Sequence, residues 1–120
     1  MPRFQRIYWK KEFDWDNYAK LYDIYSRSNG NYYLLSSLEL IKDVNLKKDS
    51  KIIDLACGTG ALTNLIIRRH PKANIFAIDL SKEMIHYYKK NFVKEINSGR
   101  IEAQVYNAEK ISKITKEKYD

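Results

Sequence analysis

The chain of 120 residues is poor in cysteine, proline and glycine, with one, two and four of these residues respectively. Its single cysteine, Cys57, has no partner for a disulfide within the chain, which fits the reducing cytoplasm where we expect the protein to reside. No apolar run reaches the roughly 18 residues of a transmembrane helix, and residues 1–12 lack the apolar stretch of a signal peptide. The sequence therefore predicts no membrane span, no secretion signal and no disulfide scaffold.

Long blocks of one charge are also missing, although the net charge is +7. Basic residues collect in residues 42–51, 68–72 and 110–118, where they alternate with acids near the ends of predicted helices. Cations are favoured at helix C-termini, so we interpret these residues as a solvated surface and do not expect a nucleic-acid partner. The two histidines, His70 and His86, stand far apart, and we predict no metal site.

The most informative stretch is residues 51–63, which reads KIIDLACGTGALT. A short apolar run over residues 52–56 is bounded by two glycines, Gly58 and Gly60, and an amphipathic run follows. This order predicts a buried strand, a tight turn and a helix. Glycine lets the turn adopt positive φ and approach a ligand closely, and the free N–H groups of a helix N-terminus favour an anionic or polar ligand group.

A second strand and helix are predicted after the first helix, which should end near Pro71. Residues 74–79 form an apolar run that ends in Asp79, 21 residues beyond Gly58. Nucleotide sites place an acid at about this distance, because a carboxylate can accept hydrogen bonds from both ribose hydroxyls. Ser81 is a suitable N-cap. One helix is expected after it, with an apolar face made by Ile85, Tyr88, Phe92 and Ile96.

A third strand is predicted over residues 100–106, where Ile101, Ala103 and Val105 alternate with polar residues as in an edge strand. Asn107 follows, in a sequence typical of a turn between a strand and a helix.

Two helices are predicted before the first strand. Residues 13–29 place four aromatic side chains, Trp15, Tyr18, Tyr22 and Tyr25, along one helix face. This stripe suits either a lid over a ligand or plain packing on the domain. Asp14 or Asp16 could cap the helix, and Gly30 is suited to ending it. Residues 31–43 form the second helix, and residues 1–12 are expected to be a loose arm.

The string DLACGTG resembles motif I of the class I S-adenosylmethionine (AdoMet)-dependent methyltransferases. AIDLSKEMI resembles the second motif of that family, and Asn107-Ala108-Glu109 resembles its Asp-Ala-Glu turn, with asparagine in place of the first acid. WxxYAxxYD, which begins at Trp15, is similar to the N-terminal segment of the quinone-biosynthesis-like members. A dinucleotide site remains an alternative, although the third glycine of GxGxxG is replaced by Thr63.

The resemblance implies a Rossmann-like α/β/α fold in which a partial doubly wound parallel sheet has strand order 3-2-1 and is preceded by helices. It also implies AdoMet as the cofactor. Backbone groups of Ala56, Gly58 and Gly60 would contact its methionine part, with Asp54 positioning the loop. Asp79 would hold the ribose and Leu80 would pack on the adenine. The remaining expected contacts are Asn107, Ala108 and Glu109 around the adenine edge, and Trp15, Tyr18 and Tyr22 as a lid.

By the same resemblance, residues 1–45 are an arm and helical cap, and residues 46–120 are the cofactor-binding half of the domain, which stops before a fourth strand. The expected activity is transfer of a methyl group from AdoMet to a small-molecule acceptor, with no catalytic residue identified. One alternative is a non-catalytic AdoMet-binding module, or half of a split enzyme that is completed by a second chain. Besides the acceptor, the expected partner is a second chain that supplies the C-terminal half, with self-association as the alternative. A fragment of an NAD-dependent oxidoreductase is a further alternative.

Overall fold

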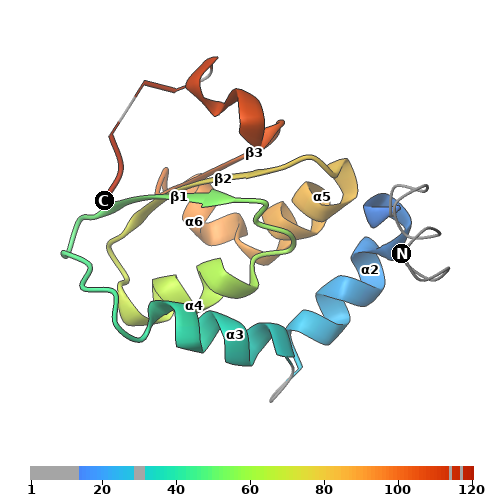
Figure 1. The fold of residues 1–120 in the computed structure, drawn as a ribbon, viewed down its shortest axis with the longest axis horizontal. Helices are drawn as coiled ribbons and strands as arrows, with labels where there is room; N and C mark the ends of the chain where they lie inside the picture. Colours follow the sequence, from blue (N-terminus) through green and yellow to red (C-terminus); the bar gives the residue numbers. More distant parts are fainter. Residues whose placement is uncertain (1–13, 29–31, 114, 117) are drawn as a thin grey trace, which may run out of the picture.

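Three parallel strands form the central sheet of the computed structural model, which describes residues 14–28, 32–113, 115–116 and 118–120 (Figure 1). They are β1 (Lys51–Leu55), β2 (Asn74–Asp79) and β3 (Ile101–Val105), in the order β1-β2-β3. This arrangement confirms the predicted α/β class and the 3-2-1 strand order. The predicted arm at residues 1–12 and the helix stop at Gly30 lie outside the described residues.

Parallel pairing aligns the carboxyl ends of the strands at one edge of the sheet. In the register, Leu55 of β1 lies opposite Ile78 of β2, and Asp79 lies opposite Val105 of β3. Ligands of open α/β sheets bind at this edge, because the loops that follow the strands converge there. Val105 is 48% exposed, as expected at the end of an edge strand.

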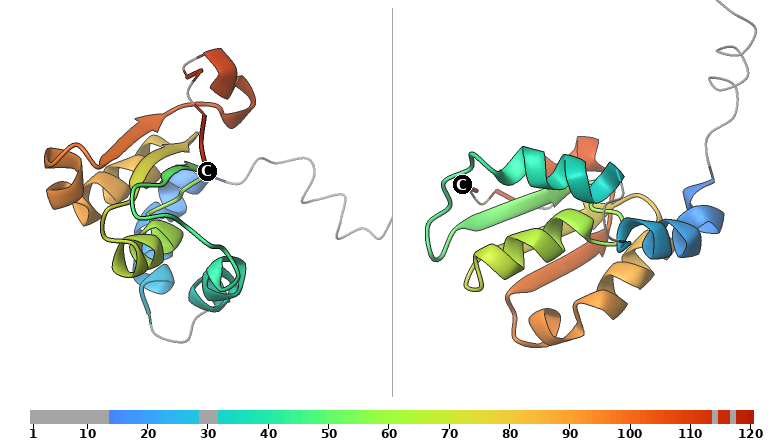
Figure 2. Two further views of the ribbon diagram at one scale, coloured as in Figure 1. Left: turned by 90° about the vertical axis from the view of Figure 1, so that its left-hand side faces the viewer. Right: turned by 90° about the horizontal axis from the view of Figure 1, so that it is seen from below.

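Helices connect the strands and cover one side of the sheet, as two further views show (Figure 2). The connecting helices are α4 (Ala61–Arg69), α5 (Lys82–Asn91) and α6 (Val93–Asn97). The two helices before β1 are α2 (Trp15–Ser26) and α3 (Tyr32–Ile41). None of the helices in the described part of the chain is long and apolar enough to cross a membrane.

The prediction of a single helix after Ser81 is wrong, because the backbone leaves helical geometry at Phe92. This break separates α5 from α6. Phe92 has φ −124° and ψ 35°, and its buried ring packs against Tyr88 with the two ring centroids 4.8 Å apart. The ring also lies where a Cβ on Gly60 would be, 2.1 Å from that position. Packing on the loop after β1 therefore overrides the helical periodicity of residues 85–96.

The core lies between the sheet and these helices. Ile75, Ala77, Ile101 and Ala103 point from β2 and β3 toward Ile66, Ile85, Tyr88 and Phe92 of the connecting segments. All of these side chains are buried, so they supply the main hydrophobic stabilisation of the domain.

The opposite face of the sheet and the free edge of β1 are less covered. The segment after β3 contains a 3-10 helix, η1 (Ala108–Lys113), and returns over this face (Figure 1). The backbone N–H of Asp120 donates to the carbonyl of Lys51 at 2.7 Å, and Asp120 Oδ2 accepts from the Lys51 N–H at 2.8 Å. Among the described residues, no strand pairs with this edge of β1.

Candidate cofactor site

The loop between β1 and α4 has three residues with positive φ. Ala56, Gly58 and Gly60 have φ values of 56°, 58° and 101°. The two glycines adopt this region without a steric penalty, whereas Ala56 does so at some cost. Residues held in sparsely populated backbone conformations often mark functional sites. The sequence predicted the glycines, but it contains no signal for the left-handed conformation of Ala56.

Asp79 fastens this loop to the end of β2. Its Oδ2 accepts a hydrogen bond from the Gly58 N–H at 2.9 Å, and its Oδ1 accepts one from the Ser81 N–H at 2.9 Å. The Cys57 N–H donates to the Ile78 carbonyl at 3.0 Å, which gives the loop a second tie to β2. An ionised carboxylate has about four acceptor positions, so each oxygen of Asp79 can accept one more hydrogen bond.

Asp54 and Gly60 lie away from the cavity to which Gly58 contributes. Asp54 is buried, and its Oδ2 accepts a hydrogen bond from the Thr63 hydroxyl at 3.1 Å. Thr63 Oγ1 is also 2.9 Å from the Tyr88 hydroxyl oxygen, which extends a chain of buried polar groups beneath the loop. Thr63 occupies the position of the third glycine in a dinucleotide fingerprint, and its hydroxyl bridges Asp54 and Tyr88. Asp54 can support the loop from below, while Gly60 makes room for Phe92.

A cavity of about 450 Å³ lies at the carboxyl ends of the three strands. Its volume falls within the range typical of small-molecule sites, roughly 300–1,000 Å³. It brings together most of the predicted site residues from four separate stretches of the chain. Those that line it are Trp15, Tyr22, Ala56, Gly58, Asp79, Leu80, Asn107, Ala108 and Glu109.

Two further residues, Met84 and Tyr106, line the cavity and were not predicted. Met84 lies in the first turn of α5, where its N–H donates to the N-cap Ser81 Oγ at 3.1 Å. Met84 lies three residues after the cap, on the same side of the chain as Leu80. This spacing is present in the sequence and could have identified Met84 as a lining residue. Leu80 is 74% exposed, so this wall offers an apolar surface to a ligand.

The turn after β3 differs in detail from the expectation for Asn107. Its Oδ1 accepts a hydrogen bond from the Glu109 N–H at 3.0 Å, which closes a local turn. The side-chain oxygen is therefore engaged within the chain and has one remaining acceptor position for an adenine amino group. The Tyr106 N–H donates to the Asp79 carbonyl at 3.0 Å, which holds this turn beside the end of β2.

Helix α2 brings its aromatic stripe to the cavity. The ring centroids of Trp15 and Tyr22 are 6.2 Å apart in an edge-to-face arrangement, and both side chains line the cavity. The Tyr18 ring packs on both of them but does not line the cavity. A Cβ on Gly58 would stand 3.0 Å from Tyr22 Cε1, so this ring lies directly on the glycine loop.

Polar contacts fix α2 at both ends. Asp14 caps the helix by accepting from the Asn17 N–H, as predicted. Asp16 instead accepts hydrogen bonds from the Ser81 hydroxyl at 2.5 Å and from the Glu83 N–H at 3.2 Å, and these bonds lower its pKa. At the other end, Ser26 Oγ lies 3.2 Å from Thr59 Oγ1. The aromatic wall of the cavity is therefore tied to α5 and to the glycine loop.

Burial affects the titration of Asp54. It raises the pKa of this carboxyl from 3.8 to about 6; the Thr63 hydrogen bond opposes the shift and the charge of Asp79 adds to it. Between these two pH values the folded state keeps a proton that the unfolded state releases, so the free energy of unfolding falls as the pH rises. This rise of the pKa of Asp54 from 3.8 to about 6 corresponds to a decrease of up to about 3 kcal/mol in the free energy of unfolding.

Replacement of Asp54 by asparagine is expected to remove this decrease in the free energy of unfolding, because the asparagine side chain is neutral. Its oxygen can still accept the hydrogen bond from Thr63. Urea unfolding near pH 4 and near pH 7 measures the change in the free energy of unfolding. Asp43→Asn, at an exposed position, is the control and should retain the wild-type difference. An unchanged pH dependence in Asp54→Asn would show that the carboxyl is not perturbed in this way.

Comparison with known proteins gives one family match and several relatives. The family described as "Methyltransferase domain" matches residues 46–120. The chain is 36% identical over 89 residues to the malonyl-[acyl-carrier protein] O-methyltransferase of Priestia megaterium, which covers 72% of the chain and 30% of that protein. It is 44% identical over 48 residues to the trans-aconitate 2-methyltransferase of Pseudomonas paraeruginosa, covering 40% of the chain and 18% of the relative.

A structure from Methanococcus maripaludis, described as an S-adenosyl-L-methionine-dependent methyltransferase, resembles this fold with a TM-score of 0.61 and 26% sequence identity. The alignment covers 81% of the chain and 43% of that structure. The chain thus spans less than half the length of each of these three proteins.

Proposed function

Because the chain belongs to the methyltransferase domain family, whose cofactor is AdoMet, we propose that its 450 Å³ cavity is the AdoMet site and that it serves methyl transfer to a small-molecule acceptor. The observation that carries this proposal is the meeting of Gly58, Asp79 and Asn107 in one cavity, although each follows a different strand. The resemblance assigns these residues to different parts of one cofactor, and their common lining supports that assignment.

The chemistry of the lining fits the parts of AdoMet. The remaining acceptor positions of Asp79 suit two ribose hydroxyls, and the exposed Leu80 with Met84 suits the apolar face of adenine. The backbone at Ala56 and Gly58 lines the cavity, and Gly58 itself adds no side chain between its backbone and the methionine part. The rings of Trp15 and Tyr22 can face a cationic centre, which is attracted to aromatic faces.

When bound, AdoMet supplies an electrophilic methyl group on a sulfonium. Displacement at such a group depends strongly on the distance and alignment of the reacting atoms. The contribution of this chain is orientation: Asp79 fixes the loop, and the ties of Asp16 and Ser26 fix the aromatic wall. No residue of the described part is assigned a catalytic proton transfer, and no group of three His, Cys, Asp or Glu residues there is placed to hold a metal ion.

Preference for AdoMet over NAD is the direct test of the proposed site. The buried Thr63 at the third glycine position and the cofactor-sized cavity at the described strand ends favour AdoMet. Isothermal titration calorimetry should give saturable binding of AdoMet and S-adenosylhomocysteine and weaker or no binding of NAD. Tighter binding of NAD would overturn the proposal.

Replacement of Asp79 by alanine is expected to weaken AdoMet binding by about 1.5–3 kcal/mol, the range for a hydrogen bond to a charged group, or roughly 10- to 150-fold in Kd. The loop also loses its acceptor for the Gly58 N–H. Calorimetry of Asp79→Ala measures the change, and the exposed Asp43→Ala is the control. The ribose assignment is wrong if the Asp79 variant binds AdoMet as well as the wild-type protein does.

The methyl acceptor and the completeness of the enzyme are two further parts of the proposal. Their names include an acyl-carrier-bound acid and trans-aconitate, so a panel of small carboxylic acids is the first set of acceptors to assay. The alternative of a non-catalytic module or half of a split enzyme predicts binding of AdoMet with turnover only after a second chain is added.

A further inference from the structure

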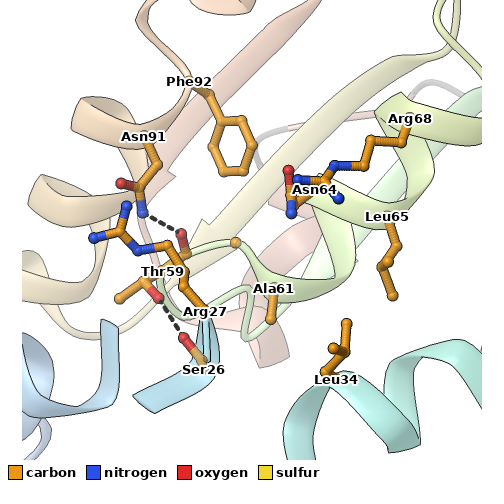
Figure 3. A pocket seen from close by; sticks show the side chains of 11 residues that line it. Ser26, Arg27, Leu34, Thr59, Ala61, Asn64, Leu65, Arg68, Asn91 and Phe92 are labelled. Carbon is orange, nitrogen blue, oxygen red and sulfur yellow. Dashed lines mark hydrogen bonds between the residues drawn. The ribbon is translucent and has the colours of Figure 1, made fainter. Parts of the chain in front are cut away.

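A second cavity, of about 280 Å³, lies among helices α2, α3, α4 and α5 (Figure 3). It shares no lining residue with the proposed AdoMet site, but it includes Thr59 and Gly60 of the same loop. Among the described residues that line it there are two arginines and two asparagines but no carboxylate. The cavity is therefore rich in hydrogen-bond donors and positively charged.

One wall of this cavity is a face of α4. Asn64 and Arg68 are one helical turn apart, and Figure 3 shows their side chains close together. Within the described ranges, neither side chain makes a hydrogen bond or an ion pair. Their donors are therefore available to a ligand.

Arg27 and Asn91 form the facing wall, where contacts with Asp23 hold them in place. Arg27 Nη2 donates to Asp23 Oδ2 at 3.0 Å, and Asn91 Nδ2 donates to Asp23 Oδ1 at 2.8 Å and to the Thr59 carbonyl at 3.0 Å. The buried Asp23 thus offsets one of the two arginine charges. Arg27 keeps further N–H donors, since a guanidinium has five. The two arginines together with Asp23 therefore carry one net positive charge.

Apolar side chains complete the lining. Leu34 of α3 and Leu65 of α4 face each other in Figure 3, and the ring of Phe92 lies on the other side of the loop. A ligand that fits this lining has one anionic group and a short apolar part. Guanidinium groups bind carboxylate and phosphate oxygens well because of their planar set of donors.

We propose that this cavity binds a small organic oxyanion, a carboxylate or a phosphate attached to a short apolar group, with Asn64, Arg68 and Arg27 as its donors. The alternative explanation is that Arg68 is a solvent-exposed cation stabilised by the C-terminus of α4. Arg69 also lies in the last turn of α4 but does not line the cavity. Substitution of Arg69 therefore distinguishes the two explanations.

The test is a titration of the full chain, followed by ¹⁵N–¹H NMR at constant ionic strength, with benzoate, phenyl phosphate and the uncharged benzamide. Saturable shifts at Gly60, Ala61 and the Asn64 side-chain amide are expected with at least one of the two anions. The anion that binds more tightly identifies the preferred group. Saturable binding of neither anion, or equal binding of benzamide, would overturn the proposal.

Arg68→Gln should raise the Kd of the bound anion roughly five- to tenfold, because it removes a charge-assisted hydrogen bond. Arg69→Gln should change the Kd less than twofold. Equal effects of the two variants would mean diffuse surface charge and would refute the site. Asn64→Ala, which leaves the charge unchanged, is the second variant should Arg68→Gln fail to fold, and it should also weaken binding. The measurements need no AdoMet, so they are independent of the proposed function.

Discussion

Replacement of Gly58 by valine is expected to abolish measurable AdoMet binding. Gly58 has φ 58°, a region that is strongly disfavoured for a β-branched residue. A Cβ there would also stand 3.0 Å from Tyr22 Cε1 and 3.2 Å from Tyr22 Oη, so the ring must move. The substitution therefore displaces both the loop and an aromatic wall of the cavity. Calorimetry with AdoMet measures the loss.

Gly99→Val is the matched control for this experiment. Gly99 has φ 81°, and a Cβ there would meet no heavy atom within 4 Å. It therefore shares the backbone strain of Gly58→Val without the collision, and Gly99 is not part of the cavity. We expect Gly99→Val to lower thermal stability but to bind AdoMet normally. A folded Gly58→Val protein that binds AdoMet with the wild-type affinity would show that this loop does not contact the cofactor.

The strand, glycine loop and helix of residues 51–69 could be predicted from sequence because their signals are local. An apolar run, two glycines and a helical face are each determined by neighbouring residues. Asp79 could be predicted for a related reason, since the length of one strand-helix-strand unit places its side chain beside Gly58. The three strands and their parallel order follow from the same repeating unit.

The contacts that organise the site over long sequence distances could not be predicted. Asp16 bonds to Ser81 65 residues away, and Thr63 meets Tyr88 25 residues away; neither pair has a periodic signature. The break at Phe92 depends on how its ring packs over Gly60, a tertiary effect that helical periodicity does not contain. Side-chain pairing across elements therefore sets the details that local patterns leave open.

The 120-residue chain alone is expected to show no methyl transfer and to self-associate or to require a partner chain. In the described residues, β1 is paired on one edge only, apart from the contacts of Lys51 with Asp120, and Leu55 at its end is 47% exposed. An unpaired strand edge is a template for pairing with another chain. The two contacts of Asp120 engage only the backbone of Lys51, the first residue of β1, so among the described residues the rest of this edge is open to such pairing.

Among the described residues, the lining of the proposed AdoMet site comes only from α2 and the segments that follow β1, β2 and β3, and none of it is assigned to a methyl acceptor. An acceptor must be held in line with the methyl group for efficient transfer, and these segments are assigned to the cofactor. Sedimentation velocity of the purified chain over a range of concentrations measures association, and labelled AdoMet with a panel of small acids measures turnover. A monodisperse monomer that methylates an acceptor would refute this expectation, because it would show that three strands suffice for both stability and catalysis.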